Sequence, residues 1–521
     1  MISSYLWRLL VLAVILQYVR RSEAKANKQV QGQQVESRQE ASAEQPNVRP
    51  DMQANTALVA LQKLITSLTT EDLNPLFLTP YIQNCSYELG RNKSKVALFE
   101  LFANVSAYSG YITVNSTTNS HLFFLFVEAE GNSSDAPLLL WTQGGPGLSA
   151  LFGQFLQNGP IAFTGNPSLP LSLRPKTLQK NMSVLYLDVP LGAGFSFTGG
   201  PDAYPKSLED ITVTVIIFLK QFLELFSHYN GRDLYLAGES YGARYSVAVM
   251  DWMLKNNSVP INPKGVIGGN GFLGPVLEVA DSSDFLYRMS MLDIQGRQTF
   301  HEQFLTIRAL AESKNDTQIM IALHLLLNTI FTSEKQPTLF QNLTLYSDHA
   351  SPMTTNRPLV MMLCFVFLST NTTKAMLHAG VNNTFQLYNE GLLKSLALDW
   401  LRDISHINEH VLNKSRVLFY TGQMDALFPS VNQRNYYKRL NWTLSKEYEN
   451  ADRYPWKPYE NYYGFAGYIK TVENFTEAVL LGMSHYGAAE KPDEVYHLMT
   501  EFIANSSKVQ SVLAATTDKL E

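Results

Sequence analysis

The feature that most constrains the fold is the pentapeptide Gly238-Glu-Ser-Tyr-Gly242, together with the segments on either side of it. Residues 232–237 before it have the alternation and length of a buried strand, and residues 243–254 after it have the pattern of a helix. Glycines two positions before and after a serine permit the sharp, strained turn that lifts the serine oxygen out of a sheet. The helix N-terminus then points backbone N–H groups at a developing oxyanion. We therefore predict that Ser240 is a catalytic nucleophile.

Strands and helices alternate on both sides of this turn. The other strands are predicted at residues 111–115, 121–127, 137–141, 184–188, 416–421 and 478–483, and the other core helices at residues 207–228, 393–408 and 493–504. This alternation indicates an α/β fold with a parallel sheet and crossover helices.

Residues 276–390 differ from this pattern. They have a helical period at 298–310 and 319–331, break for a loop near 336–357, and contain no clear strand. We interpret them as a helical cap insertion between two parts of the core, residues 61–275 and 391–521.

The first 60 residues are predicted to lie outside the folded core. Residues 5–19 are apolar but too short for a comfortable membrane span, and they are followed by two arginines and a small-x-small pattern that ends at Ala24. Residues 1–24 are therefore predicted to be a signal peptide, with an uncleaved anchor as the alternative. Residues 25–60 are polar and rich in Gln and Ser, which predicts a disordered leader or propeptide.

Glycosylation sequons support a secretory route and predict N-linked glycans. They lie at Asn84, Asn92, Asn104, Asn115, Asn132, Asn181, Asn256, Asn315, Asn342, Asn371, Asn382, Asn413, Asn441, Asn474 and Asn505. The net charge of −5 provides no basic surface, so nucleic acid is excluded as a predicted partner. The two cysteines, Cys85 and Cys364, either form one disulfide or leave a buried thiol at Cys364. No His or Cys grouping has metal-ligand spacing, so we predict neither a metal nor a cofactor.

A serine nucleophile needs a base, and the base needs an orienting acid, in the chain order Ser, Asp or Glu, His. Of the ten histidines, His485 alone follows immediately after a late predicted strand, whereas the others precede the serine or lie in predicted helices and connections. Asp425 follows the strand 416–421 directly, while Asp452 lies in a polar loop. A surface-loop histidine and a turn aspartate are the alternative interpretations.

A glycine-rich segment follows another predicted strand. Residues 141–147 read Trp-Thr-Gln-Gly-Gly-Pro-Gly, where the glycines let the backbone approach a ligand closely or form an ordinary tight turn. Beside a catalytic serine, a backbone N–H from this segment is a natural second donor to the oxyanion.

Taken together, these motifs resemble those of the serine carboxypeptidases of the α/β-hydrolase fold, most closely the vitellogenic-like branch. The resemblance covers residues 76 to about 504 and rests on the segments 76–81, 141–147 and 188–197, on the G-E-S-Y turn, and on the strand end 420–425. It implies a central, mostly parallel sheet flanked by helices, with a mainly helical cap. It also implies a secreted or lysosomal enzyme that acts on peptide or protein C-termini.

The resemblance implies a role for each matching residue. Ser240 would be the nucleophile, His485 the general base and Asp425 its orienting acid, which forms a triad that acts through an acyl-enzyme. The N–H groups of Gly145 and Tyr241 would form the oxyanion hole. The substrate carboxylate would be held by Gln143 and by Glu239, the latter as a protonated acid that donates a hydrogen bond.

Three segments depart from the family pattern. The family's E-S-Y-A-G-x-Y-V-P is here residues 239–247 with the small pair reversed and the proline absent. Where the family has glutamate in F-x-E-x-G-P, this chain has Gln157. The family's G-x-G-H-x-x-P-x-x-x-P is altered over residues 482–492. Two other functions therefore stay open: an esterase or acyltransferase on the same fold, and a non-catalytic secreted glycoprotein.

Overall fold

The computed structural model describes residues 61–131, 135–166, 169–313, 315–331 and 336–504. The predicted signal peptide, residues 1–24, and leader, residues 25–60, lie outside the described residues and stay predictions.

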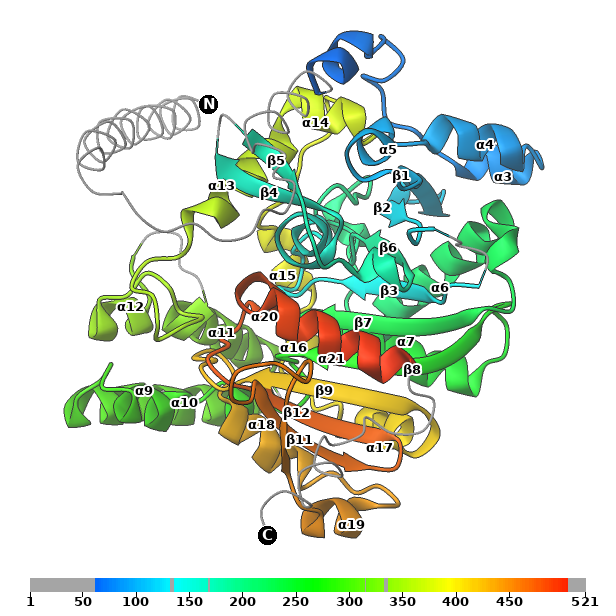
Figure 1. Cartoon of the computed structure of the whole chain (residues 1–521). Helices are drawn as coiled ribbons and strands as arrows, with labels where there is room; N and C mark the ends of the chain where they lie inside the picture. The colour runs from blue at the N-terminus through cyan, green and yellow to red at the C-terminus, as the bar shows by residue number, and fades with distance from the viewer. Residues whose placement is uncertain (1–60, 132–134, 167–168, 314, 332–335, 505–521) are drawn as a thin grey trace, which may run out of the picture. The chain divides into compact units, whose positions relative to one another are not determined.

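A ten-stranded sheet forms the centre of the molecule, with the strand order β1-β2-β6-β3-β7-β8-β9-β12-β11-β10 (Figure 1). The six inner strands, from β6 to β12, run parallel, and the outer strands on both sides pair antiparallel. The predicted mostly parallel sheet is therefore confirmed. The strands are β1 (Ala107–Asn115), β2 (Ser120–Val127), β3 (Leu138–Thr142), β6 (Ser183–Leu187), β7 (Asp233–Glu239), β8 (Asn262–Gly269), β9 (Arg416–Gly422), β10 (Tyr454–Trp456), β11 (Gly467–Val472) and β12 (Phe475–Leu480).

Both faces of this sheet are buried, because helices cover each of them (Figure 1). Strand β2 shows how the sequence achieves this: Phe124 and Phe126 lie in one hydrophobic cluster, and Phe123 and Leu125 lie in the other. The first cluster contains residues of α6 (Leu208–Leu225), α7 (Tyr241–Lys255) and α17 (Ser405–Lys414). The second contains residues of α5 (Ala97–Ala103), η1 (Gly153–Asn158) and α21 (Pro492–Ala504).

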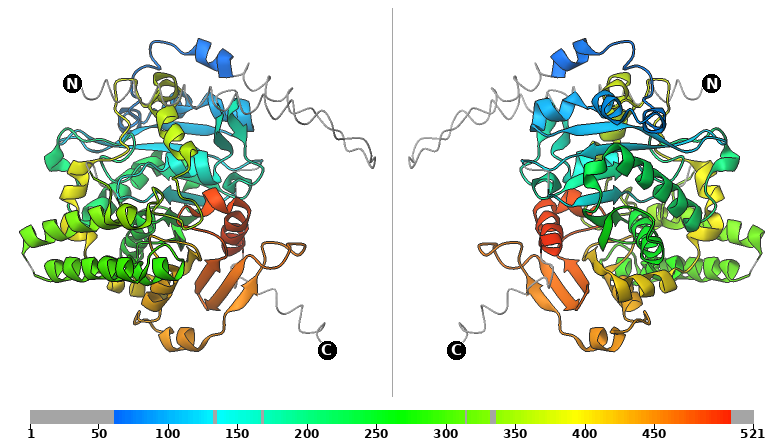
Figure 2. Two further views of the ribbon diagram at one scale, coloured as in Figure 1. Left: turned by 90° about the vertical axis from the view of Figure 1, so that its left-hand side faces the viewer. Right: turned by 90° about the vertical axis from the view of Figure 1, so that its right-hand side faces the viewer.

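The insertion between β8 and β9 is helical, and no strand occurs in the described part of residues 276–390 (Figure 2). Its helices are α8 (Val276–Val279), α9 (Ser283–Arg288), α10 (Ile294–Ala311), α11 (Asp316–Leu326), η5 (Leu327–Phe331), α12 (Leu339–Thr344), α13 (Leu359–Ser369) and α14 (Asn371–Met376), with α15 (Glu390–Ser395) and α16 (Ala397–Trp400) leading back to the core. The remaining elements are α3 (Thr79–Gln83), α4 (Tyr87–Ser94), β4 (Ile161–Asn166), β5 (Leu169–Leu173), η2 (Leu178–Lys180), η3 (Pro201–Ala203), η4 (Ser227–Tyr229), α18 (Ser430–Tyr437), α19 (Ser445–Asn450) and α20 (Gly487–Glu490).

Several elements differ from the sequence-based prediction, which lacks β4, β5, β8, β10 and β11 and contains one unbroken helix at 393–408. Strand β8 is missing from it, because glycine and proline make this segment a poor match to a strand pattern. A side chain at Gly269 would overlap Tyr420 of β9, so glycine is needed there for the neighbouring ring. The predicted helix 393–408 is broken, since the carbonyls of Asp399 and Arg402 accept hydrogen bonds from the buried Arg244 guanidinium, 2.9 and 2.8 Å away.

Candidate active site

Ser240 sits in a strained turn between β7 and α7. Its backbone has φ 58° and ψ −125°, a conformation that a residue with a side chain adopts only when the surroundings impose it. The glycines on either side make the turn possible: a side chain at Gly238 would overlap the backbone of Gly242, and one at Gly242 would overlap the Thr142 carbonyl. The predicted strand–turn–helix geometry is therefore present.

His485 and Asp425 lie side by side in the loops that follow β12 and β9. His485 Nδ1 is 2.9 Å from Asp425 Oδ2, and both side chains are buried. The other carboxylate oxygen, Oδ1, accepts hydrogen bonds from the backbone N–H groups of Leu427 and Phe428, each at 2.9 Å. Burial alone lowers the pKa of His485, but the charge and hydrogen bond of Asp425 outweigh it, so the pKa is raised above its ordinary value.

Asn270, which sequence reasoning missed, connects the serine turn to the histidine loop. The carbonyl of Gly269, the residue before Asn270, accepts a hydrogen bond from the Ser240 N–H at 2.9 Å. The Asn270 amide group donates to the carbonyls of Ser484 and His485 at 2.9 and 2.8 Å, and its oxygen accepts from the Gly422 N–H at 2.7 Å. The side chain is fully buried. Asn270 therefore connects the C-terminal ends of three neighbouring strands, β8, β9 and β12.

Glu490 secures the histidine loop from the other side. Its carboxylate accepts hydrogen bonds from the Ser484 N–H at 2.6 Å and from the Ser484 hydroxyl. Ser484 stands where the related motif has glycine, so this departure comes with a partner that uses the added hydroxyl. Ser484, the residue immediately before His485, is thereby held at its carbonyl by Asn270 and at its N–H by Glu490.

The glycine-rich segment packs directly on the nucleophile. A side chain at Gly144 would come within 2.6 Å of the Ser240 Cβ, so only glycine allows this approach. Gly145 follows with φ +113°, a backbone conformation that favours glycine. Tyr241 is the first residue of α7, and its N–H therefore has no acceptor within the helix. The two predicted oxyanion donors thus belong to segments that flank Ser240.

Gln143, Gln157 and Glu239 form a buried cluster beside the serine. The amide nitrogens of Gln143 and Gln157 donate to the same oxygen, Glu239 Oε2, at 2.7 and 2.6 Å. The Gln143 oxygen in turn accepts from the Trp141 indole at 3.0 Å. The second oxygen, Glu239 Oε1, is buried without a hydrogen-bond partner among the described residues.

Burial controls the ionisation of Glu239. It raises the pKa of this carboxyl to about 7, and this effect exceeds the opposing ones of His485 and of the two amides. Replacing the family's second acid by Gln157 therefore does not return Glu239 to the pKa of an ordinary glutamate.

The remaining candidates lie elsewhere. His410, which the sequence pattern placed on the connection between a helix and the strand 416–421, lies instead inside α17, where its Nδ1 is 2.7 Å from Asp251 Oδ1. Cys85 is exposed, Cys364 is buried, and both are free thiols.

Among residues 61–131, 135–166, 169–313, 315–331 and 336–504, no group of three or more His, Cys, Asp or Glu residues could hold a metal ion. None of the helices that the structure describes is long and apolar enough to span a membrane.

Comparisons with known proteins identify the family to which this chain belongs. The family model described as serine carboxypeptidase matches residues 99–505. A probable serine carboxypeptidase CPVL from Pongo abelii is 33% identical, covering 82% of this chain and 89% of its own length. The venom serine carboxypeptidase of Apis mellifera is also 33% identical (83% and 91%), and the vitellogenic carboxypeptidase of Aedes aegypti is 30% identical (83% and 90%).

Among solved structures, the fold is similar to that of Kex1Δp, a prohormone-processing carboxypeptidase from Saccharomyces cerevisiae. The TM-score is 0.65 at 19% identity, over 80% of this chain and 96% of that one. The extent of the family match, together with relatives above 30% identity along most of their length, places this chain in the serine carboxypeptidase family.

Proposed function

We propose that this serine-type carboxypeptidase removes C-terminal residues from peptides through Ser240, His485 and Asp425, by way of an acyl-enzyme. The observation that carries this proposal is the buried His485–Asp425 hydrogen bond, in a loop that Asn270 joins to the strand end bonded to a serine in a strained turn. Asp425 occupies Nδ1 of the imidazole, which leaves Nε2 as the atom that takes a proton from the Ser240 hydroxyl.

The proposed reaction has two halves. The Ser240 oxygen attacks the carbonyl carbon of the last peptide bond while His485 takes its proton, and the N–H groups of Gly145 and Tyr241 stabilise the oxyanion. His485 then gives the proton to the leaving amine, and the C-terminal amino acid departs. Water, deprotonated by His485, cleaves the resulting ester and restores Ser240.

Glu239 supplies the recognition of the substrate's C-terminus. Because Oε2 accepts two amide N–H groups, the proton of the neutral carboxyl group belongs on Oε1, the oxygen without a described partner. From there it donates to the substrate carboxylate, and the second N–H of the Gln143 amide is available for the same ligand. An ionised Glu239 would instead repel it.

Product analysis on N-blocked dipeptides tests this function. Release of the free C-terminal amino acid, together with labelling of Ser240 by a fluorophosphonate probe, is the expected result. Labelling with hydrolysis of esters but not of peptides would instead favour the esterase or acyltransferase. Absence of labelling would favour the non-catalytic glycoprotein.

The pH dependence tests the role of Glu239. Substrate binding requires protonated Glu239 and catalysis requires neutral His485, so kcat/KM for free-acid peptides should fall above about pH 7 as Glu239 ionises. Gln157→Glu adds a second acid beside Glu239, which raises the pKa of the pair's last proton and should move this fall to higher pH. The measurement is kcat/KM against pH, with C-terminally amidated peptides as the control that carries no terminal charge. Superimposable curves for wild type and Gln157→Glu would contradict the assigned role.

The secretory route is also part of the proposal. Asn132 and Asn505 lie outside the described residues, and each of the other thirteen sequon asparagines is exposed, as attachment of a glycan requires. We expect the secreted or lysosomal protein to begin near Lys25 and to gain mobility on deglycosylation. N-terminal sequencing and gel electrophoresis check this. Retention of Met1 together with an unchanged mobility would contradict it.

A further inference from the structure

The cap reaches the catalytic histidine through the loop between α12 and α13. The carbonyl of Ala350 in this loop accepts hydrogen bonds from the N–H of His485 at 3.4 Å and from the N–H of Ala426 at 3.3 Å. These two N–H groups belong to the catalytic histidine and to the residue after the catalytic aspartate. The cap loop is therefore attached directly to the active site.

Two nitrogen-containing side chains, those of His349 and Arg357, lie next to this attachment. The guanidinium nitrogen Nη2 of Arg357 lies 3.2 Å from each ring nitrogen of His349, the residue before Ala350. Burial, the Arg357 charge and nearby His485 hold the pKa of His349 well below its ordinary value, so the imidazole is neutral. The pair therefore carries a single positive charge, which resides on the exposed Arg357.

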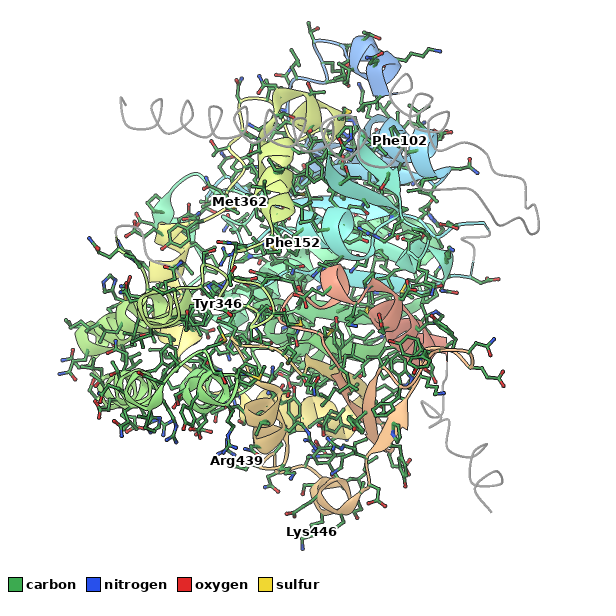
Figure 3. All side chains as sticks on the ribbon, turned by 60° about the vertical axis from the view of Figure 1, so that its left-hand side comes forward. Phe102, Phe152, Tyr346, Met362, Arg439 and Lys446 are labelled. Atoms are coloured by element: carbon green, nitrogen blue, oxygen red, sulfur yellow. The ribbon has the colours of Figure 1, made fainter. Side chains whose placement is uncertain are left out.

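The segment that follows His485 lies between this charge and the carboxylate-binding residues. A side chain at Gly487 would come within 3.1 Å of Glu239 Oε1, so this segment borders the proposed position of the substrate carboxylate. The Tyr486 ring packs at 5.9 Å from the ring of Phe152. Burial raises the pKa of the Tyr486 phenol to about 12, while the charge of Arg357 opposes this rise and that of Glu239 adds to it. Figure 3 shows Phe152 near the middle of the molecule, close to the cap.

The neighbouring acids are engaged in other contacts. Asp348 is buried and accepts hydrogen bonds from the Ala350 N–H at 3.0 Å and the Thr354 hydroxyl at 2.8 Å, within its own loop. Glu490 is bonded to Ser484. Arg357 has no carboxylate of the described residues within ion-pairing distance, so its charge is available to a ligand.

We propose that Arg357, seated on His349, is a specificity-determining residue that favours substrates with an acidic C-terminal residue. This inference rests on the proposed function, because it takes the substrate carboxylate to lie at Glu239. The side chain of the same residue then extends along Tyr486 toward the cap loop, where Arg357 attracts a carboxylate. The two anionic groups of a C-terminal Glu or Asp would thus contact two separate parts of the site.

The test compares kcat/KM for N-blocked dipeptides that end in Glu, Gln and Lys, which have similar length but different charge. The wild type should prefer Glu over Gln, and Arg357→Gln should reduce that preference by about three- to tenfold while leaving the rate on the Gln peptide unchanged. Arg357→Glu should shift the preference toward Lys. Arg439→Gln is the matched control, an exposed arginine that Figure 3 shows at a distance from Phe152.

The outcomes separate the inference from the proposed function. Hydrolysis of all three peptides with equal preferences in wild type, Arg357→Gln and Arg357→Glu would overturn the role of Arg357 and leave the carboxypeptidase intact. The role of Arg357 would also be overturned if Arg357→Gln changed the preference only for peptides whose acidic residue lies just before the scissile bond and not at the C-terminus. Failure to cleave any of the three peptides would instead contradict the proposed function.

Discussion

Ser240→Ala is expected to reduce kcat on N-blocked dipeptides by about 10⁴-fold or more while the protein still folds and is secreted. The substitution removes only the Oγ atom that we propose as the nucleophile. The strained backbone at φ 58° is imposed by the close packing of Gly144, Gly238 and Gly242 around it, which alanine does not disturb. The measurement is single-turnover and steady-state release of the C-terminal amino acid, with circular dichroism as the check on folding.

Three further variants sharpen this prediction. His485→Ala should be about as damaging, and the double variant should lose little more, because triad members act as a unit. Ser246→Ala is the matched control: this serine lies on α7, the helix that follows Ser240, and donates to the Gly242 carbonyl at 3.1 Å, so its loss should leave the rate near normal. A near-normal rate in Ser240→Ala would exclude this serine as the nucleophile.

The parts that sequence predicts well are those determined by local geometry. The strand before Ser240 and the helix after it follow from apolar periodicity, and the glycine spacing dictates the turn between them. The same holds for β9 and β12, whose ends deliver Asp425 and His485. In each case the side chain lies within a few residues of the strand that positions it.

The parts that sequence did not reveal depend on contacts between distant segments. Asn270 follows a glycine-rich strand that lacks a strand pattern, and its three partners lie about 150 to 215 positions further along the chain. The pKa of Glu239 depends on how completely the fold buries it, which a comparison of Gln157 with an acid cannot show. Similarly, Arg357 is one of many charged residues until the Ala350 carbonyl places its loop against His485.

Asp425→Asn is expected to be less damaging than Ser240→Ala or His485→Ala, with kcat lowered by about 10³- to 10⁴-fold and the fold unchanged. The reason lies in the two sets of bonds that Asp425 makes. Its Oδ1 accepts the N–H groups of Leu427 and Phe428, and these donors require an oxygen. The asparagine oxygen must therefore take that position, and its NH₂ group faces His485 Nδ1.

An amide that donates to Nδ1 stabilises the wrong tautomer of His485. The ring proton moves to Nε2, which then cannot accept the proton of the Ser240 hydroxyl. Loss of the Asp425 charge also removes the effect that raises the pKa of His485 against burial, so the imidazolium that forms during attack is destabilised. The acid limb of the pH profile should consequently move to lower pH, a change that a structural defect would not produce. Asp452→Asn, at an exposed loop aspartate, is the matched control. A loss of less than tenfold in Asp425→Asn would show that His485 keeps its working tautomer without this carboxylate.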